Sequence, residues 1–243
     1  MRTSRRGANA DDGWTSEVSS GFALAGFLGL VFVAFTALAI GPMMKFDAYF
    51  NLAPPPEGWV PFLHVLDRIG QRAVCLPVLA VFTYLACRHQ RSWRPGFVAA
   101  VSVFTLNLLV LILKLILARS APQTADPSFF TGGMAYPSGH SANIVLVYGL
   151  VAYLLSRYHS IGRRTEVALW AVVAVLSVTM VVTSLTLNWH WFADLIAGLL
   201  VGAVVLQLTA TVDRAVPATG FAHGWRQGVR DLVAAVRPGG RLT

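Results

Sequence analysis

Six long apolar segments constrain the fold of this chain more than any other feature of its sequence. A helix that crosses a membrane needs about 20 mostly apolar residues. Hydrophobic residues make up 56% of the chain and charged residues 12%, which excludes an ordinary soluble domain with one buried core. The sequence therefore predicts an all-α, polytopic membrane protein with six transmembrane helices in a bundle. The expected spans are Gly21–Met44, Gln71–Cys87, Phe97–Leu117, Ser138–Leu155, Glu166–Leu187 and Trp191–Ala210.

The basic residues predict the orientation of these helices. With the N-terminus in the cytoplasm, 14 of the 19 Lys and Arg residues fall in cytoplasmic segments, which is the positive-inside pattern. We therefore expect a multi-pass protein of the cell membrane with both termini cytoplasmic. The net charge of +8 is then a topology signal rather than a sign of nucleic acid binding. The predominance of Arg over Lys is typical of a GC-rich bacterial genome.

One membrane domain is expected at residues 21–212, between a cytoplasmic tail at 1–20 and a basic cytoplasmic tail at 213–243. Before the second span, Gly58–Gln71 has apolar residues at helical spacing, with His64, Asp67 and Arg68 facing away from them. This pattern predicts an amphipathic helix on the outer side of the membrane. The helix could be a solvated cap over the bundle or a guide for a lipid substrate.

Polar residues gather where three of the predicted spans meet the outer side. Because successive spans run in opposite directions, these residues are expected at one end of the bundle. An acid three residues into the apolar sixth span is costly unless it is paired, and His190 lies one helical turn before it. The set consists of Lys114 and Arg119 after the third span, Ser138 and His140 before the fourth, and His190 and Asp194 before the sixth.

This set favours phosphoryl transfer. A histidine whose second ring nitrogen donates to a carboxylate is held in one tautomer and made more basic, so His190 beside Asp194 can act as a nucleophile toward phosphorus. His140 can then protonate the leaving oxygen as a general acid. Nothing in the sequence requires a metal ion, although two histidines and a carboxylate could bind one.

The remaining polar residues could bind the phosphate. Lys114 and Arg119 would neutralise its oxygens, and the backbone N–H groups at Ser138 and Gly139 would point at an anion from the start of a helix. Arg119 lies about 140° around an unbroken helix from Lys114, so it can reach the site only if the helix ends first. Additional donors could come from Asn188 and Ser184.

Three motifs in order resemble the type 2 phosphatidic acid phosphatase (PAP2) superfamily. The segment "PSGH" ends at His140, "HWFAD" runs from His190 to Asp194, and Lys114 precedes Pro122 at the family's spacing. The resemblance implies six spans, His190 as a nucleophile that becomes phosphohistidine, His140 as the acid, and no metal or other cofactor. It also implies a lipid-linked phosphate or diphosphate as substrate, of the phosphatidic acid, phosphatidylglycerophosphate or polyprenyl diphosphate type, hydrolysed at the extracytoplasmic face.

Two family arginines are absent. Ala121 stands where the first motif should carry one, and Ser184 stands where the third motif should carry the other, after Thr183. Charge-assisted contacts to a transferring phosphoryl group each contribute a few kcal/mol. A phosphatase that lacks both is therefore expected to be slow unless another group compensates.

Three other functions remain open from the sequence. A PAP2-type phosphotransferase would pass the phosphoryl or head group to an alcohol, and its relatives lack some of these arginines. A non-catalytic protein could keep the fold and bind a lipid, but it would have no physical reason to retain a buried acid beside a histidine. The segment "GHSA" at Gly139–Ala142 also fits the pattern of intramembrane serine proteases. The oligomeric state is not predicted.

Overall fold

The computed structural model describes the backbone of residues 4–216 and the side chains from Ser16 onward. Every regular element in this part of the chain is helical, which confirms the all-α expectation. The elements are α1 (Ser4–Ile40), α2 (Met43–Tyr49), η1 (Glu57–Trp59), α3 (Val60–Arg68), α4 (Arg72–Gln90), α5 (Arg94–Leu117), η2 (Pro122–Thr124), α6 (Gly139–Asn143), η3 (Ile144–Tyr148), α7 (Gly149–His159), α8 (Arg163–Thr186) and α9 (Phe192–Ala215).

Six segments of the described residues are long and apolar enough to cross a membrane, as the sequence predicts. The expected domain limits at 20 and 212 do not coincide with helix ends, because α1 starts at Ser4 and α9 continues to Ala215. Most of the predicted basic tail, residues 217–243, lies outside the described residues.

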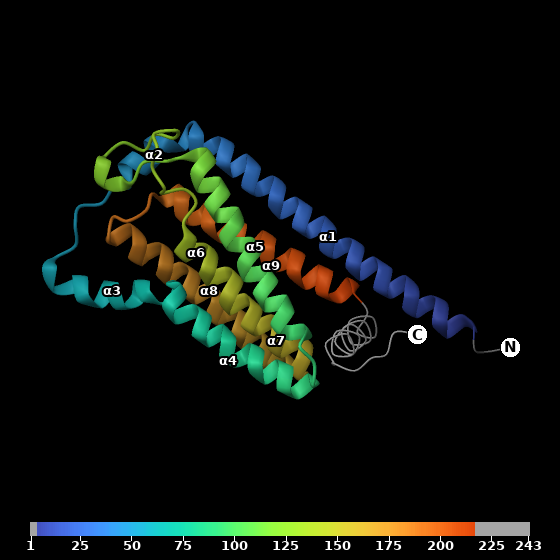
Figure 1. Ribbon diagram of the computed structural model, residues 1–243. Helices are drawn as coiled ribbons and strands as arrows, with labels where there is room; N and C mark the ends of the chain where they lie inside the picture. Colours follow the sequence, from blue (N-terminus) through green and yellow to red (C-terminus); the bar gives the residue numbers. More distant parts are fainter. Residues whose placement is uncertain (1–3, 217–243) are drawn as a thin grey trace, which may run out of the picture.

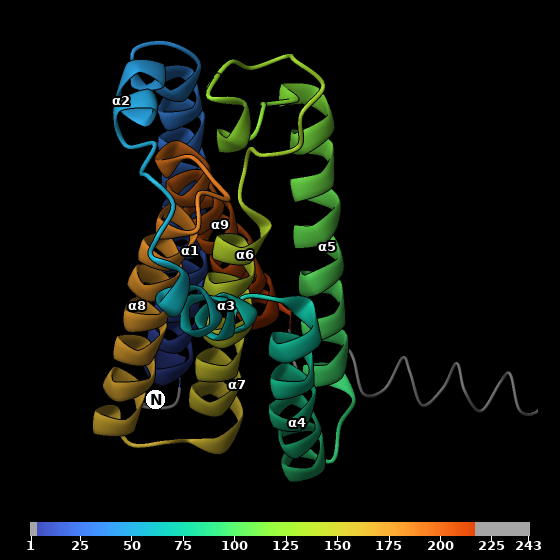
Figure 2. The same cartoon turned by 90° about the vertical axis from the view of Figure 1, so that its left-hand side faces the viewer.

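The six spanning segments alternate in direction along the bundle (Figure 1). One end of the bundle carries α2, α3 and the loop between α5 and α6, and we call it the site end. The start of α1 and the end of α9 lie at the other end, which we call the opposite end. Helix α3 lies across the site end rather than along the bundle (Figure 2). The polar residues of the third, fourth and sixth spans therefore meet at the site end.

Helix α9 lies at the centre of the bundle, where α1, α5, α6, α7 and α8 all contact it. Two of its glycines are one helical turn apart and face the start of the fourth span. A Cβ atom on Gly198 would collide with the backbone carbonyl oxygen of Ser138, and one on Gly202 would lie 2.6 Å from that of Ala142. Small residues at this spacing let two membrane helices approach closely. The fourth span is thereby held against the sixth next to the "PSGH" segment.

The fourth span is one helix with a π-helical turn, η3, in its middle, and it is the most buried of the six. The side chains of Ile144, Leu146, Leu150 and Leu154 are all excluded from the surface. Many apolar side chains of the outer helices are exposed, including Phe104 on α5 and Val175 on α8. A chain with a buried core and an apolar exterior is what a lipid environment requires.

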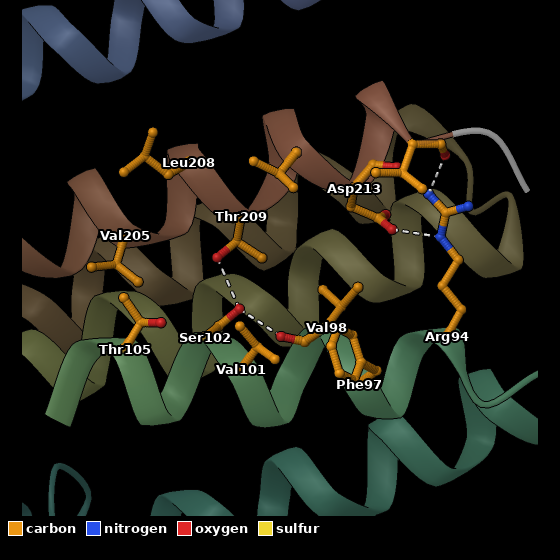
Figure 3. A pocket seen from close by; sticks show the side chains of 12 residues that line it. Arg94, Phe97, Val98, Val101, Ser102, Thr105, Val205, Leu208, Thr209 and Asp213 are labelled. Carbon is orange, nitrogen blue, oxygen red and sulfur yellow. Dashed lines mark hydrogen bonds and ion pairs between the residues drawn. The ribbon is translucent and has the colours of Figure 1, made fainter. Parts of the chain in front are cut away.

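A buried ionic cluster ties the helices together at the opposite end. Asp213 on α9 accepts hydrogen bonds from Arg94 Nε at 2.8 Å, Tyr153 Oη at 2.7 Å and Tyr158 Oη at 2.9 Å. Arg94 also donates to the carbonyl oxygen of Val216. An apolar groove of about 270 Å³ runs between α5 and α9 from this cluster toward Thr105 (Figure 3). The groove lies away from the polar residues of the site end.

Candidate active site

The chain leaves α5 sharply just before the first polar group of the site. Helix α5 ends at Leu117, and Ala118 adopts a left-handed conformation with φ of 43°. Arg119 could reach the site only if the helix ended before it, and this turn ends the helix there. Arg119 therefore points inward instead of lying about 140° around the helix from Lys114. The loop that follows is fixed by backbone hydrogen bonds, including Ala135 N–H to the carbonyl oxygen of Arg119 at 3.0 Å.

Arg119 is completely buried and binds two carboxylates. Its Nη1 lies 2.6 Å from Asp194 Oδ1, and its Nη2 lies 2.5 Å from Asp47 Oδ2. Its Nε donates to the carbonyl oxygen of Pro127 at 3.0 Å. The rings of Phe129 and Trp191 flank the guanidinium, with centroids 4.6 and 5.6 Å from its central carbon. These contacts occupy the charge of Arg119 within the protein and leave it none for a phosphate.

Asp47 was not singled out from the sequence. It lies on the short helix α2, is buried, and accepts a hydrogen bond from the backbone N–H of Ala193 at 3.0 Å through its other oxygen. It therefore connects Arg119 to the first turn of α9. Asp47 stands between two apolar residues in a connecting segment and belongs to no motif. Only the folded structure therefore shows that Arg119 is its partner.

His190 and Asp194 are in contact, as their spacing suggests, but not through a helical turn. Helix α9 begins at Phe192, so His190 precedes it, and Trp191 is the N-cap residue. Asp194 Oδ2 accepts from Trp191 N–H at 3.0 Å and lies 3.3 Å from His190 Nδ1. The carboxylate thus caps the helix and holds one ring nitrogen of the histidine, while the other nitrogen, Nε2, has no hydrogen-bond partner among the described residues.

The "PSGH" segment forms the start of the fourth span. Ser138 is the N-cap of α6, and its hydroxyl accepts from Ser141 N–H at 3.4 Å. Its own N–H donates to the carbonyl oxygen of Asp194 at 2.8 Å. These bonds use the groups of Ser138 that were expected to bind phosphate. Gly139 and His140, by contrast, are partly exposed at the mouth of the helix.

His140 faces an acid that the sequence interpretation placed elsewhere. Asp67 was expected to face away from the apolar side of its helix, but it is fully buried, and its Oδ2 lies 3.8 Å from His140 Nε2. Gln71 Nε2 donates to the same oxygen at 3.2 Å. No partner within the described residues contacts the second oxygen, Oδ1. The side chain of His140 remains 31% exposed, so it is open to a ligand.

The predicted amphipathic helix is present as η1 and α3. Trp59 and Phe62 are exposed on its outer side, as expected for a helix at a membrane interface, whereas Leu63 packs inward. His64 contacts Trp189 from the loop before α9, with ring centroids 5.2 Å apart. The helix therefore contributes to the site end of the bundle rather than lying apart from it.

Lys114 points toward the loop that leads to the fourth span. Its ammonium group donates to the carbonyl oxygens of Met134 and Ala135. An ammonium group has three hydrogens, so one is left for a ligand. The neighbouring Tyr136 is buried and exchanges a hydrogen bond with Thr36 at 2.7 Å. Burial raises the pKa of Tyr136 to about 12, so its hydroxyl stays neutral at physiological pH.

The remaining predicted donors lie at the edge of the site. Ser184 is fully buried on α8, and its hydroxyl contacts Met180 Sδ at 3.6 Å. Asn188 is partly exposed, and its backbone carbonyl oxygen accepts from Gln123 Nε2 at 2.6 Å. Ser141, which the "GHSA" pattern would make a protease nucleophile, is fully buried beside Gly198 of α9. The described residues contain no cluster of three or more metal-binding side chains.

Fold and site together define a class: a polytopic helical membrane protein with a carboxylate-held histidine opposite a second histidine at one end of its bundle. The PAP2 superfamily model matches residues 95–216, half of the chain. This chain belongs to the PAP2 superfamily.

Two comparisons give phosphatases from Bacillus subtilis that resemble this chain. Phosphatidylglycerophosphatase B of Bacillus subtilis (strain 168) is 23% identical over 148 residues, which cover 61% of this chain and 72% of that protein. The crystal structure of a transmembrane PAP2 type phosphatidylglycerolphosphate phosphatase from Bacillus subtilis superposes with a TM-score of 0.69 and 19% identity. The superposition covers 80% of this chain and 98% of the chain in that structure. The family and its phosphatases support a phosphatase activity and a membrane location for this chain.

Proposed function

We propose that this protein is a lipid phosphatase that hydrolyses a lipid-linked phosphate monoester through a phosphohistidine on His190. The observation that carries the proposal is the contact of His190 Nδ1 with Asp194 Oδ2 at 3.3 Å. It makes Nδ1 the hydrogen-bond donor and leaves Nε2 with a free lone pair. Phosphatidylglycerophosphate is the first substrate to test, because the relative from Bacillus subtilis is named for it.

In the first step, Nε2 of His190 attacks the phosphorus, and the bond from phosphorus to the lipid oxygen breaks. His140 in its protonated form gives its proton to that oxygen, so the lipid leaves as an alcohol. The carboxylate of Asp67, 3.8 Å from His140 Nε2, favours the protonated form that this step needs. The phosphoryl group remains on His190, whose positive charge is balanced by Asp194.

In the second step, water attacks the phosphohistidine. His140, now neutral, takes a proton from the water, the bond from phosphorus to Nε2 breaks, and inorganic phosphate leaves. Both histidines return to their starting states, so no other reactant is consumed. Lys114 and the backbone N–H groups at the start of the fourth span, at Gly139 and His140, stabilise the phosphoryl oxygens.

In this mechanism Arg119 is a positioning residue rather than a phosphate ligand. Its guanidinium fixes Asp194 from the side opposite His190 and is held in turn by Asp47. A carboxylate fixed by three donors can hold the imidazole of His190 in one orientation throughout the reaction. The positive-inside distribution of basic residues favours placing this site at the extracytoplasmic face.

The experiment is phosphate release by the purified full-length protein in detergent, with phosphatidylglycerophosphate and phosphatidic acid as substrates. We expect release that His190→Ala abolishes and that EDTA does not affect. The matched control is His89→Ala, because His89 is an exposed histidine at the opposite end of the bundle. Release that persists in His190→Ala would exclude the proposed nucleophile.

A second candidate function is transfer of the phosphoryl or head group to an alcohol. The observation that favours it is the lack of the family arginines at Ala121 and Ser184, the latter being fully buried. Labelled phosphorus and an added acceptor alcohol separate the two activities. Label in inorganic phosphate supports hydrolysis, and label in a new lipid supports transfer.

A further inference from the structure

The site as proposed lacks positive charge for its substrate. A phosphate monoester carries close to two negative charges at neutral pH. Arg119 is neutralised by Asp194 and Asp47, and Ala121 and Ser184 carry no charge. Of the motif residues, only Lys114 offers a positive charge that lasts through both steps, because His140 gives up its proton in the first, and two carbonyl oxygens already share the ammonium group of Lys114.

A cation from outside the family motifs lies next to the corner that packs against His140. Arg72 is the first residue of α4, immediately after the corner that joins α3 to α4. It lies close enough to Lys114 and to His140 to interact electrostatically with both side chains. Its side chain is exposed. No carboxylate of the described residues forms an ion pair with it, so its charge is available.

The fold fixes the position of this corner against the fourth span. Asn143 Nδ2 donates to the carbonyl oxygen of Gly70 at 3.2 Å, and Tyr148 Oη donates to that of Ile69 at 3.0 Å. A Cβ atom on Gly70 would lie 3.1 Å from the Cβ and the carbonyl oxygen of His140, so the two backbones are in close contact. Arg72 therefore starts from a backbone that is anchored beside the general acid.

We propose that Arg72 binds the phosphate of the lipid substrate and supplies the positive charge that the family arginines would supply at positions 121 and 184. The inference rests on the proposed function. A guanidinium can donate two parallel hydrogen bonds to a phosphate, which suits it to this role better than a lysine. The corner between α3 and α4 would then contribute two residues to the site: Asp67 to the acid and Arg72 to the substrate.

The test measures hydrolysis by the full chain in detergent, with inorganic phosphate as a competitive inhibitor. Arg72→Ala is expected to raise both KM and the inhibition constant of phosphate by about 10- to 100-fold, because a charge-assisted contact is lost. Both constants of Arg72→Lys should lie between those of the unaltered protein and those of Arg72→Ala. The matched control is Arg88→Ala at the far end of the same helix, which should leave both constants unchanged.

The double variant Arg72→Ala, Ala121→Arg tests whether the missing family charge can take over. It is expected to recover a lower KM than Arg72→Ala alone. An inhibition constant for phosphate that is the same in Arg72→Ala and in the unaltered protein would overturn the inference. So would an equal effect of Arg88→Ala, because it would assign the change to the general attraction of anionic lipid by basic residues.

Direct titration of the protein with inorganic phosphate separates this inference from the proposed function. If the unaltered protein releases no phosphate from any lipid, the proposed function fails. The weaker phosphate binding of Arg72→Ala in the titration would still support the phosphate site. Hydrolysis by the unaltered protein with no change in phosphate affinity in Arg72→Ala would refute the role of Arg72 alone.

Discussion

Arg119 and Asp194 form a fully buried ion pair, with Nη1 of the guanidinium 2.6 Å from Oδ1 of the carboxylate. The other oxygen of Asp194 holds His190, so the two residues on either side of this carboxylate have different tasks. One fixes the carboxylate in the protein, and the other is the proposed nucleophile. In the proposed mechanism, Arg119, which lies between Lys114 and Pro122 of the first motif, builds the site rather than binding the substrate.

Arg119→Ala is predicted to lower both stability and turnover. It leaves two buried carboxylates without their partner, and breaking a buried pair costs about 3–5 kcal/mol. Thermal unfolding in detergent and kcat for phosphate release measure the two effects. Asp47→Asn distinguishes two roles of Arg119. If Arg119 positions Asp194, the variant should have a lower kcat. If Arg119 binds phosphate, its release from Asp47 should give the variant a lower KM.

Asp67→Asn is predicted to lower kcat by about 10-fold while leaving KM nearly unchanged. The carboxamide keeps the shape of the side chain but removes the charge that favours protonated His140. The rate should therefore decline with rising pH at a lower pH than in the unaltered protein, because His140 loses its proton more easily. A uniform loss of rate at every pH would instead indicate a purely structural role for Asp67.

Gly198→Ala is predicted to reduce turnover by more than about 10-fold. The added methyl group would collide with the backbone of Ser138 and force the fourth span away from α9. His140 would then move away from His190. Gly26→Ala on α1 is the matched control, since nothing lies within 4 Å of a Cβ atom there. Equal activity of the two variants would show that this close contact does not position the acid.

Asp213→Asn is predicted to lower stability without a direct effect on the chemistry. The change removes the charge of the only ion-pair partner of buried Arg94 among the described residues. A loss of about 3–5 kcal/mol in the free energy of unfolding is expected. Thermal unfolding in detergent should show the loss. At a temperature where the variant remains folded, KM should equal that of the unaltered protein, because the cluster lies at the opposite end of the bundle.

The sequence predicted the parts of the fold and site that depend on local patterns. Six apolar segments of spanning length gave six membrane helices, and the spacing of His190 and Asp194 placed them in contact. The alternating direction of the spans brought Lys114, His140 and His190 to one end. These inferences need only helix geometry and the number of times the chain crosses the membrane.

The missed features depend on contacts between distant segments. Asp47 and Asp67 lie in connecting segments without a motif, and only the packed structure shows that each is buried beside a basic side chain, Asp47 beside Arg119 and Asp67 beside His140. Arg119 looked like a phosphate ligand because its carboxylate partners are 72 and 75 residues away. One signal was present in the sequence: an acid in apolar surroundings is costly unless it is paired, so each such acid requires a partner.

The central claim is that His190 carries the phosphoryl group. The most direct measurement is to stop the reaction during turnover with a phosphate-labelled lipid and to determine which residue of the full-length protein retains the label. We predict an acid-labile, base-stable phosphohistidine at His190, absent in His190→Ala. Label on another residue, or labelled protein formed equally well by His190→Ala, would contradict the mechanism.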